Sequence, residues 1–365
     1  MNYLYFLYIE FLAKHNIPQL FGNITFYIIP LLIIFVILLF VVLGLVLAER
    51  KLLGWFTQRK GPNRVGLWGI LQTLADALKL LCKENITPNG VDKFLFNLAP
   101  VLMFTPVLVV LGLIPYSAEF TFMNFQTNIL LYVVFAAMPV LCILIGAWAS
   151  NNKSSLIGGM RNVAQILAYE LPMAFTLLGI ITLASSMNLT QITLAQSSKY
   201  GIFGWFWLPC IIGLVIMFIC ILAELNRCPF DLPEAESELI CGYNTEYSGM
   251  RFALFYLSEY SLLFANALFI SVLFLGGYLS PFGKYLSPIF LPETISGIAL
   301  YFEQAFWLIL KACFVVFCAI WIRATLPRMA SFDLLKFSWT CLLPISIFNL
   351  LLMTVLKFII GGAYA

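Results

Sequence analysis

The sequence predicts an all-α integral membrane protein with eight transmembrane helices, several of them tilted or kinked, and an amphipathic interfacial helix. Of its 365 residues, 62% are hydrophobic and only 10% are charged, with a mean hydropathy of +0.98. Soluble domains are roughly 45–50% apolar. The apolar runs are long and continuous, which favours helices over the alternating strands of a membrane barrel.

Eight apolar runs have about the length of 20 residues that a helix needs to cross a hydrocarbon core of roughly 30 Å. They are residues 26–48, 95–115, 129–150, 163–184, 206–225, 251–276, 299–322 and 339–362. Prolines within or at the ends of these runs predict kinks, which can enclose a cavity, although proline is also common in ordinary transmembrane helices. We expect a single membrane domain over residues 1–365, with an unassigned N-terminal extension over 1–25.

The distribution of Lys and Arg predicts the orientation, because positive charge is retained on the cytoplasmic side. With eight spans and the first running inward, the inner loops hold 15 Lys and Arg residues against four on the outer side. Both termini are therefore expected outside. This places them in the periplasm of a bacterial cytoplasmic membrane, or in the intermembrane space if the membrane is the mitochondrial inner one.

The inner loop over residues 49–94 contains a segment with helical periodicity between Gly66 and Glu84. Its apolar residues recur on one face, while Asp76, Lys79 and Lys83 share the opposite face. This pattern predicts an amphipathic helix lying flat in the membrane interface. Such a helix could be a simple surface anchor, or it could cover a cavity or dock a partner protein.

A second inner loop, over residues 226–250, is strongly acidic. Six of the 17 carboxylates fall between Glu224 and Glu246, in a chain where charge is scarce. Each carboxylate near hydrocarbon costs roughly 2.5–3.5 kcal/mol on insertion scales, so their presence suggests a function. The loop is expected to form the mouth of a proton path or a charged cavity wall, and the alternative is a solvated loop without a role.

Charged residues also lie inside predicted spans. Glu170 and Glu259 are expected at matching depth, Glu224 and Glu246 near the inner boundary, and Lys311 near the middle of the seventh span. One Glu paired with Lys311 could be purely structural. A single lysine cannot neutralise the whole set, however, and carboxylates in series are how pumps carry protons through hydrocarbon.

Other chemistry has little support in the sequence. The nine cysteines show no C-x-x-C pair and there is one histidine, so packing is a better explanation than metal or cluster ligation. No G-x-G-x-x-G or Walker-type motif is present, and the net charge of +3 reflects the inner loops rather than a nucleic-acid surface.

Many ordered motifs resemble those of membrane subunit 1 (the H subunit in bacteria) of respiratory complex I, the proton-translocating NADH:quinone oxidoreductase. The resemblance covers about residues 26–355. It is carried by residues 49–51, 59–63, 75–79, 161–165, 169–170, 223–238, 246–249, 258–260, 321–323 and 327–328.

The resemblance implies a heel subunit that joins the hydrophilic arm to the antiporter-like membrane subunits and forms part of a chamber for ubiquinone or menaquinone. It implies a non-redox subunit, inactive alone, that binds no flavin, haem or iron–sulfur cluster. Residues implied in the quinone chamber are Glu49, Arg50, Asp76, Asp231, Glu234, Glu236, Glu238 and Arg323. Those implied in the proton path are Glu170, Glu224, Glu246, Glu259 and Lys311.

Two departures and two rival functions accompany this interpretation. The residues before 24 match no motif, and Pro172 directly follows Leu171 beside Glu170, which could alter the helix there. A stand-alone cation/proton antiporter would also bury carboxylates, but such carriers often contain inverted repeats and none is evident. The corresponding subunit of a membrane-bound hydrogenase would use no quinone, and the inner-loop motifs argue against it.

Overall fold

The structure is a computed structural model that describes residues 19–197, 201–233, 236–283, 285 and 293–360. Every regular element in these ranges is helical, and none of the described residues forms a strand. The elements are α2 (Gln19–Phe56), η1 (Leu67–Gly69), α3 (Gln72–Cys82), α4 (Lys93–Leu113), α5 (Asn128–Ala149), α6 (Lys153–Ala184), α7 (Leu189–Ala195), η2 (Gly201–Gly204), α8 (Ile211–Glu224), α9 (Glu236–Leu239), η3 (Gly242–Asn244), α10 (Gly249–Phe274), α12 (Glu293–Thr325), α13 (Ser331–Phe337), a π-helical turn (Ser338–Leu342) and α14 (Leu343–Ile360).

Seven helical segments in the described part of the chain are long and apolar enough to cross a bilayer. They are Leu32–Phe56, Lys93–Leu113, Asn128–Ala149, Lys153–Ala184, Gly249–Phe274, Ala299–Thr325 and Ser331–Ile359. The predicted all-α membrane fold is confirmed at this level. The eighth predicted span, 206–225, corresponds to α8, whose 14 residues reach only about 21 Å. Its crossing of the membrane stays a prediction.

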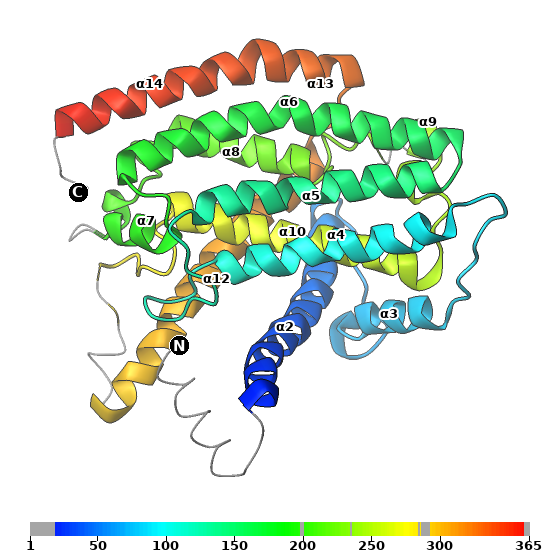
Figure 1. The fold of residues 1–365 in the computed structure, drawn as a ribbon, viewed down its shortest axis with the longest axis horizontal. Helices are drawn as coiled ribbons and strands as arrows, with labels where there is room; N and C mark the ends of the chain where they lie inside the picture. Colours follow the sequence, from blue (N-terminus) through cyan, green and yellow to red (C-terminus); the bar gives the residue numbers. More distant parts are fainter. Residues whose placement is uncertain (1–18, 198–200, 234–235, 284, 286–292, 361–365) are drawn as a thin grey trace.

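The bundle is layered around α10. Figure 1 draws α4, α5, α6, α8 and α10 with their axes roughly parallel, with α14 as an outer layer beside α6 and with α2 and α12 crossing obliquely. Of the most apolar 18-residue stretch of α10, 89% is buried inside the protein. The buried share is only 17% for α2 and 22% for the segment that ends in α14. Polar groups on α10 are therefore inside the protein rather than in lipid.

Two helices continue beyond their predicted ends. α2 extends past residue 48 through Glu49, Arg50 and Lys51 to Phe56, because Glu49 has two cationic partners inside the protein. α6 begins at Lys153 instead of 163, where the Asn152 side chain caps the helix by accepting from the Ser154 amide. These extensions place charged residues on rigid helices near one end of the bundle.

The prolines do not end the helices that contain them, and the predicted kinks stay a prediction. Pro100, Pro106, Pro139 and Pro172 all lie inside α4, α5 or α6, whose assignments are continuous. Pro115, in contrast, follows the end of α4 at Leu113. Pro172 is buried and α6 runs through it, so the proline after Glu170 does not end the helix.

The predicted amphipathic helix is shorter than residues 66–84. Its first part forms the turn η1, in which Gly69 has a φ of +76° and an added Cβ would lie 2.2 Å from the Pro62 carbonyl oxygen. The helix α3 then exposes Leu74, Leu78 and Leu81. Figure 1 draws α3 at the lower right, outside the layer of parallel helices, and it contacts α2 and α10. Its orientation in a membrane interface stays a prediction.

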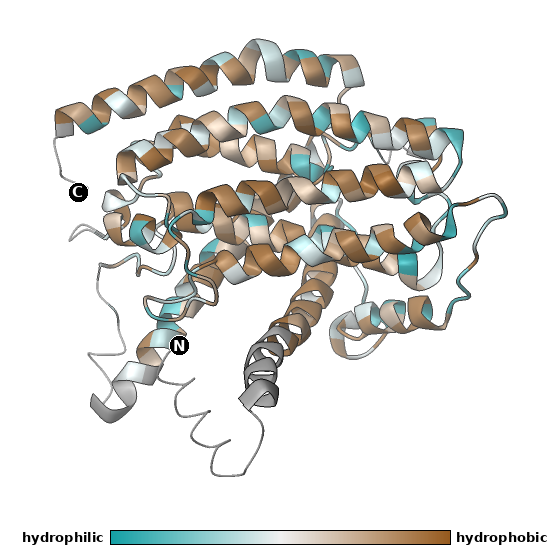
Figure 2. Cartoon of the chain, viewed as in Figure 1, coloured by the Kyte–Doolittle hydropathy of each residue, from teal (hydrophilic) through white to brown (hydrophobic). Residues whose placement is uncertain are grey.

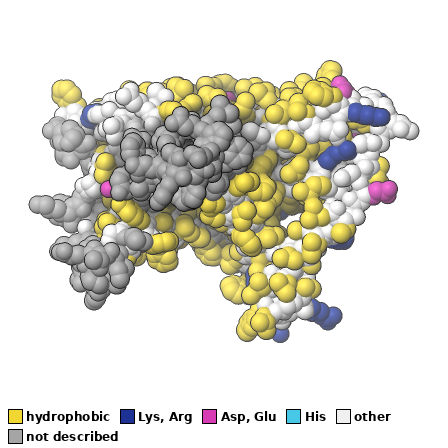
Figure 3. Space-filling view, turned by 60° about the horizontal axis from the view of Figure 1, so that its bottom comes forward, with side chains coloured by type: hydrophobic (Ala, Val, Ile, Leu, Met, Phe, Trp, Pro, Cys, Tyr) yellow, Lys and Arg dark blue, Asp and Glu magenta, His cyan; other side chains and the backbone are white. Residues whose placement is uncertain are grey.

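Hydropathy divides the surface as a membrane protein requires. In Figure 2 the long helices are mostly hydrophobic, and hydrophilic residues gather in the loops and at the end that carries α9. Figure 3 shows one face covered by hydrophobic side chains, with most of its visible Lys and Arg toward one end. The side of the membrane that this end faces stays a prediction.

Candidate functional site

Glu49 lies at the centre of a buried ion cluster. It is only 3% exposed, and its Oε2 accepts a hydrogen bond of 2.7 Å from Nη1 of Arg227, while its Oε1 accepts one from Arg323. The Tyr260 hydroxyl also bonds to Glu49. Two guanidinium groups on one carboxylate leave this cluster with a net positive charge. The sequence predicted Glu49 and Arg323 together, and the structure brings them into contact.

Arg227 connects this cluster to the rest of the site. Its guanidinium lies 4.5 Å from the centroid of the Tyr260 ring, in cation–π geometry. Burial alone would lower the pKa of Arg227, but the neighbouring Glu49 carboxylate raises it above its ordinary value, with Tyr260 and Glu259 acting in the same direction. Arg227 therefore stays charged and is electrostatically linked to both Glu49 and Glu259.

Arg50 and Asp76, also predicted for the chamber, form a separate ion pair that joins α2 to α3. Gln72 holds the other Asp76 oxygen at 3.2 Å. Adjacent residues on α2 thus have different roles. Glu49 points into the bundle, while the half-exposed Arg50 fixes the amphipathic helix next to it.

The acidic loop is tied down by two ion pairs. Asp231 pairs with Arg328 at 3.0 Å, and Glu238 pairs with Arg161 of α6 at 2.5 Å. The loop is therefore not simply solvated. Glu234, predicted for the chamber wall, lies outside the described residues, and so does the side chain of Glu236.

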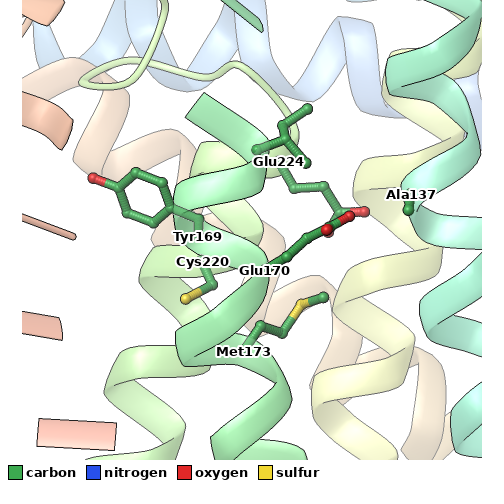
Figure 4. Close-up of a pocket in the computed structure, with 7 residues that line it drawn as sticks. Ala137, Tyr169, Glu170, Met173, Cys220 and Glu224 are labelled. Atoms are coloured by element: carbon green, nitrogen blue, oxygen red, sulfur yellow. The ribbon is translucent and has the colours of Figure 1, made fainter. Parts of the chain in front are cut away.

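Three predicted carboxylates meet through two small pockets. Glu170 of α6 and Glu224 of α8 line one pocket together, and in Figure 4 their side chains extend toward each other. Glu224 and Glu259 of α10 line a second pocket. Glu224 is therefore the shared member. Carboxylates placed this way repel when ionised, which links their protonation states.

The matching depth of Glu170 and Glu259 stays a prediction, because the first residue of a helix does not mark the membrane surface. Glu170 lies 17 residues after the start of α6 and Glu259 lies 10 after the start of α10, or roughly 26 Å and 15 Å along their axes. The prediction of matching depth took residue 163 as the start of the helix that holds Glu170, whereas α6 begins at Lys153. The link between them is made by Glu224, at the end of the short helix α8.

Neutral side chains complete the site. Asn266 donates to Oε2 of Glu224 at 3.3 Å and accepts from the Tyr132 hydroxyl at 2.8 Å. The Tyr243 hydroxyl donates to Glu259. Glu246 accepts from Asn152 at 2.7 Å and lines neither of the two pockets. Oε1 of Glu224 is buried, and among the described residues no group hydrogen-bonds to it.

Lys311 is not a counter-ion of this chain of carboxylates. Its Nζ donates to the carbonyl oxygens of Gly277 at 2.8 Å and Leu279 at 2.7 Å, beyond the far end of α10. Within the described residues it forms no ion pair. The alternative of a Glu paired with Lys311 is thus not what the structure contains.

Sequence reasoning missed Arg227, Tyr260, Asn266, Tyr132 and Tyr243 as parts of the site. A signal existed for all of them except Tyr132. Arg227 lies three residues after Glu224, and Asn266 lies seven residues, or about two turns, after Glu259 on the same face. Tyr260 directly follows Glu259, and Tyr243 lies in the acidic loop three residues before Glu246. Tyr132 gave no signal, because it contacts the site from a distant position in the sequence. Among the described residues, no group of three or more His, Cys, Asp or Glu could hold a metal ion.

The fold and the site define a multi-pass helical membrane protein with a buried ion cluster joined to buried carboxylates. Residues 29–354 match the family model for NADH dehydrogenase. The chain is 46% identical over 327 residues to the H subunit of NADH-quinone oxidoreductase from Bacillus cytotoxicus, covering 88% of this chain and 92% of the relative. The H subunits from Bacillus thuringiensis and Bacillus anthracis match equally, at 46% over the same shares.

The chain therefore belongs to the family of NADH-quinone oxidoreductase H subunits, which are membrane subunits of complex I. This is the family that the sequence motifs predicted. The match begins at residue 29 and leaves the N-terminal extension outside it.

Proposed function

We propose that this chain is the heel subunit of an NADH:quinone oxidoreductase, forming part of the quinone chamber and coupling quinone reduction to proton translocation. One observation carries the proposal. A continuous set of charged side chains runs from Arg323 and Glu49 through Arg227 to Glu259, Glu224 and Glu170.

The chamber end of this set is formed by Glu49, Arg50, Asp76 and Arg323, with the acidic loop as a wall through Asp231, Glu234, Glu236 and Glu238. The side chains of Arg50 and Arg323 are 47% and 39% exposed, so both can reach a ligand or a docked protein. Guanidinium groups suit the carbonyl and developing oxyanion of a quinone being reduced. The substrate is ubiquinone or menaquinone.

The proton path runs through the carboxylates. Glu170, Glu224 and Glu259 lie in series, and Glu246 stands at the inner boundary beside Asn152. Negative charge formed in the chamber pulls on Arg323 and Arg227, and Arg227 transmits the change to Glu259 by Coulomb interaction. Lys311, predicted as a fifth member, has different partners at the opposite end of α10.

The assembly and topology follow from this function. The chain itself carries no redox group, and flavin and iron–sulfur clusters belong to soluble-arm partners, so it is inactive alone. Its other partners are antiporter-like membrane subunits. With α8 as an eighth crossing and α3 flat in the interface, both termini lie outside a bacterial cytoplasmic membrane. The bacterial relatives favour this membrane over the mitochondrial one.

The test is Glu224→Gln, measured in the assembled complex in proteoliposomes. Glutamine keeps the hydrogen bond from Asn266 but releases no proton, so quinone-linked NADH oxidation and proton uptake should fall together. NADH oxidation by an artificial acceptor should stay intact. Glu119→Gln is the control, because Glu119 is exposed and bonds to Tyr301 far from these pockets. Normal proton uptake by Glu224→Gln would contradict the proposed path.

A further inference from the structure

The outer end of α10 is closed by an unusual number of hydrogen bonds. A helix leaves its last four carbonyl groups without partners, and in hydrocarbon each of these must be satisfied. At α10 all four are matched. Ser271 accepts from the Leu275 and Gly277 amides, Phe274 accepts from the Trp207 amide at 2.9 Å, and Val272 and Leu273 accept from a side chain outside the helix.

That side chain is Gln196, which follows α7 and is fully buried. Its Nε2 donates to the Val272 oxygen at 3.0 Å and the Leu273 oxygen at 3.2 Å. Its Oε1 accepts from the Gly276 amide at 2.9 Å. One glutamine thus binds both the final turn of α10 and the residues that follow it.

Lys311 of α12 completes the closure. Its Nζ bonds to the carbonyls of Gly277 and Leu279, and it lies 3.9 Å from the centroid of the Trp205 ring. The chain has to bend back at this point, with φ values of +72° at Gly276 and +50° at Gly277. An added Cβ at Gly276 would lie 2.5 Å from Nε1 of Trp205. The bend, the tryptophan and the lysine therefore fit one another closely.

The position of this closure relates it to the proton path. Along α10, Glu259 and Asn266 share one face, seven residues apart, and Ser271 lies nearer the outer end on a different face. A third pocket on the outer side is lined by Gln196, Trp205, Leu279 and Ser280, among others, and by no carboxylate. The closure thus separates the carboxylates from this outer pocket.

We propose that Lys311, together with Gln196 and Trp205, seals the outer end of α10 against protons, and that Lys311 is a positioning residue rather than a proton carrier. This inference rests on the proposed function, because only a proton path needs such a seal. Without the lysine, the carbonyls of Gly277 and Leu279 would need water as a partner. Water at the Gly277 carbonyl would lie beside Ser271, whose own carbonyl bonds to the Gly277 amide, and would begin a route inward toward Asn266.

The test compares Lys311→Met with Lys311→Gln in the assembled complex in proteoliposomes. Methionine fills similar volume but donates no hydrogen bond, whereas glutamine supplies two donors and carries no proton. We expect Lys311→Met to raise passive proton leak several-fold after a pH jump without NADH, and to lower protons taken up per NADH. Lys311→Gln should restore both toward wild type. Lys357→Met, on α14, is the control lysine.

The two roles of Lys311 give different results. If Lys311 carries protons, Lys311→Gln loses proton uptake as fully as Lys311→Met, and passive leak does not rise in either. That result overturns the seal, as would wild-type leak and uptake in all variants. If the complex with Lys311→Met fails to assemble, the Lys311→Gln variant decides. Wild-type leak and uptake in Lys311→Gln support the seal, and loss of proton uptake in that variant overturns the seal. If Glu224→Gln shows normal proton uptake while Lys311→Met shows a raised proton leak, the proposed carboxylate path is rejected and the seal is not.

Discussion

Glu49 and Arg227 lie 178 positions apart in the chain and form a buried ion pair with a separation of 2.7 Å. Arg323 holds the other oxygen of the same carboxylate. The three groups come from α2, from the loop after α8 and from the end of α12, so the cluster fixes three segments at the inner end of the bundle. Substitutions at this cluster are therefore expected to affect assembly.

Glu49→Gln should prevent or weaken assembly. It leaves Arg227 buried beside a second guanidinium without a negative charge, and breaking a buried pair on one side typically costs about 3–5 kcal/mol. The amount of assembled complex and its thermal inactivation temperature measure this. Arg323→Ala should be milder, because Arg227 still neutralises Glu49 and Arg323 is partly exposed. Equal losses in the two variants would argue against Arg227 as the main partner.

Arg50→Ala and Arg323→Ala should impair quinone reduction while NADH oxidation by an artificial acceptor continues. Arg50→Ala frees Asp76 and loosens α3, and Arg323→Ala removes a guanidinium from the chamber. Both rates are measured on the same membranes. Arg64→Ala is the control, because Arg64 is an exposed residue of the same inner loop. Unchanged quinone reduction in an assembled complex would contradict the chamber assignment.

Glu170→Gln and Glu259→Gln should preserve assembly and lower quinone-linked turnover and proton uptake together. Glutamine retains the hydrogen-bonding capacity of Glu259 toward Tyr243 but cannot release a proton. Proton uptake and turnover in proteoliposomes are compared with the amount of assembled complex. Normal pumping by both variants would reject the relay. Loss of assembly at unchanged specific activity would instead make these glutamates structural.

The chain should migrate in a large assembly during blue-native electrophoresis of native membranes. Its inner face carries charged loops and no redox group is proposed for it, so it has no independent activity to perform. Antibody detection of the native band, with subunit identification by mass spectrometry, makes the measurement. Migration near the mass of the chain itself, 41.2 kDa, would contradict the subunit assignment.

The sequence alone determined the helical membrane fold, seven of the spans and the family. Long apolar runs leave a chain in lipid few options besides helices, since every backbone polar group must be satisfied within the chain. The motifs in residues 223–238 and 246–249, among others, identified the family without any contact being known. They also named Glu49, Arg323, Glu170, Glu224 and Glu259 as site residues.

The tertiary structure decided which of these residues meet. Whether Lys311 faces a glutamate or the carbonyls beyond α10 depends on how α10 and α12 pack, and residue spacing carries no such information. The packing of α8 against α6 and α10 placed Glu224 between Glu170 and Glu259. Arg227 joined the site for the same reason. Local periodicity fixes the face of a helix, whereas contacts across helices arise only from packing.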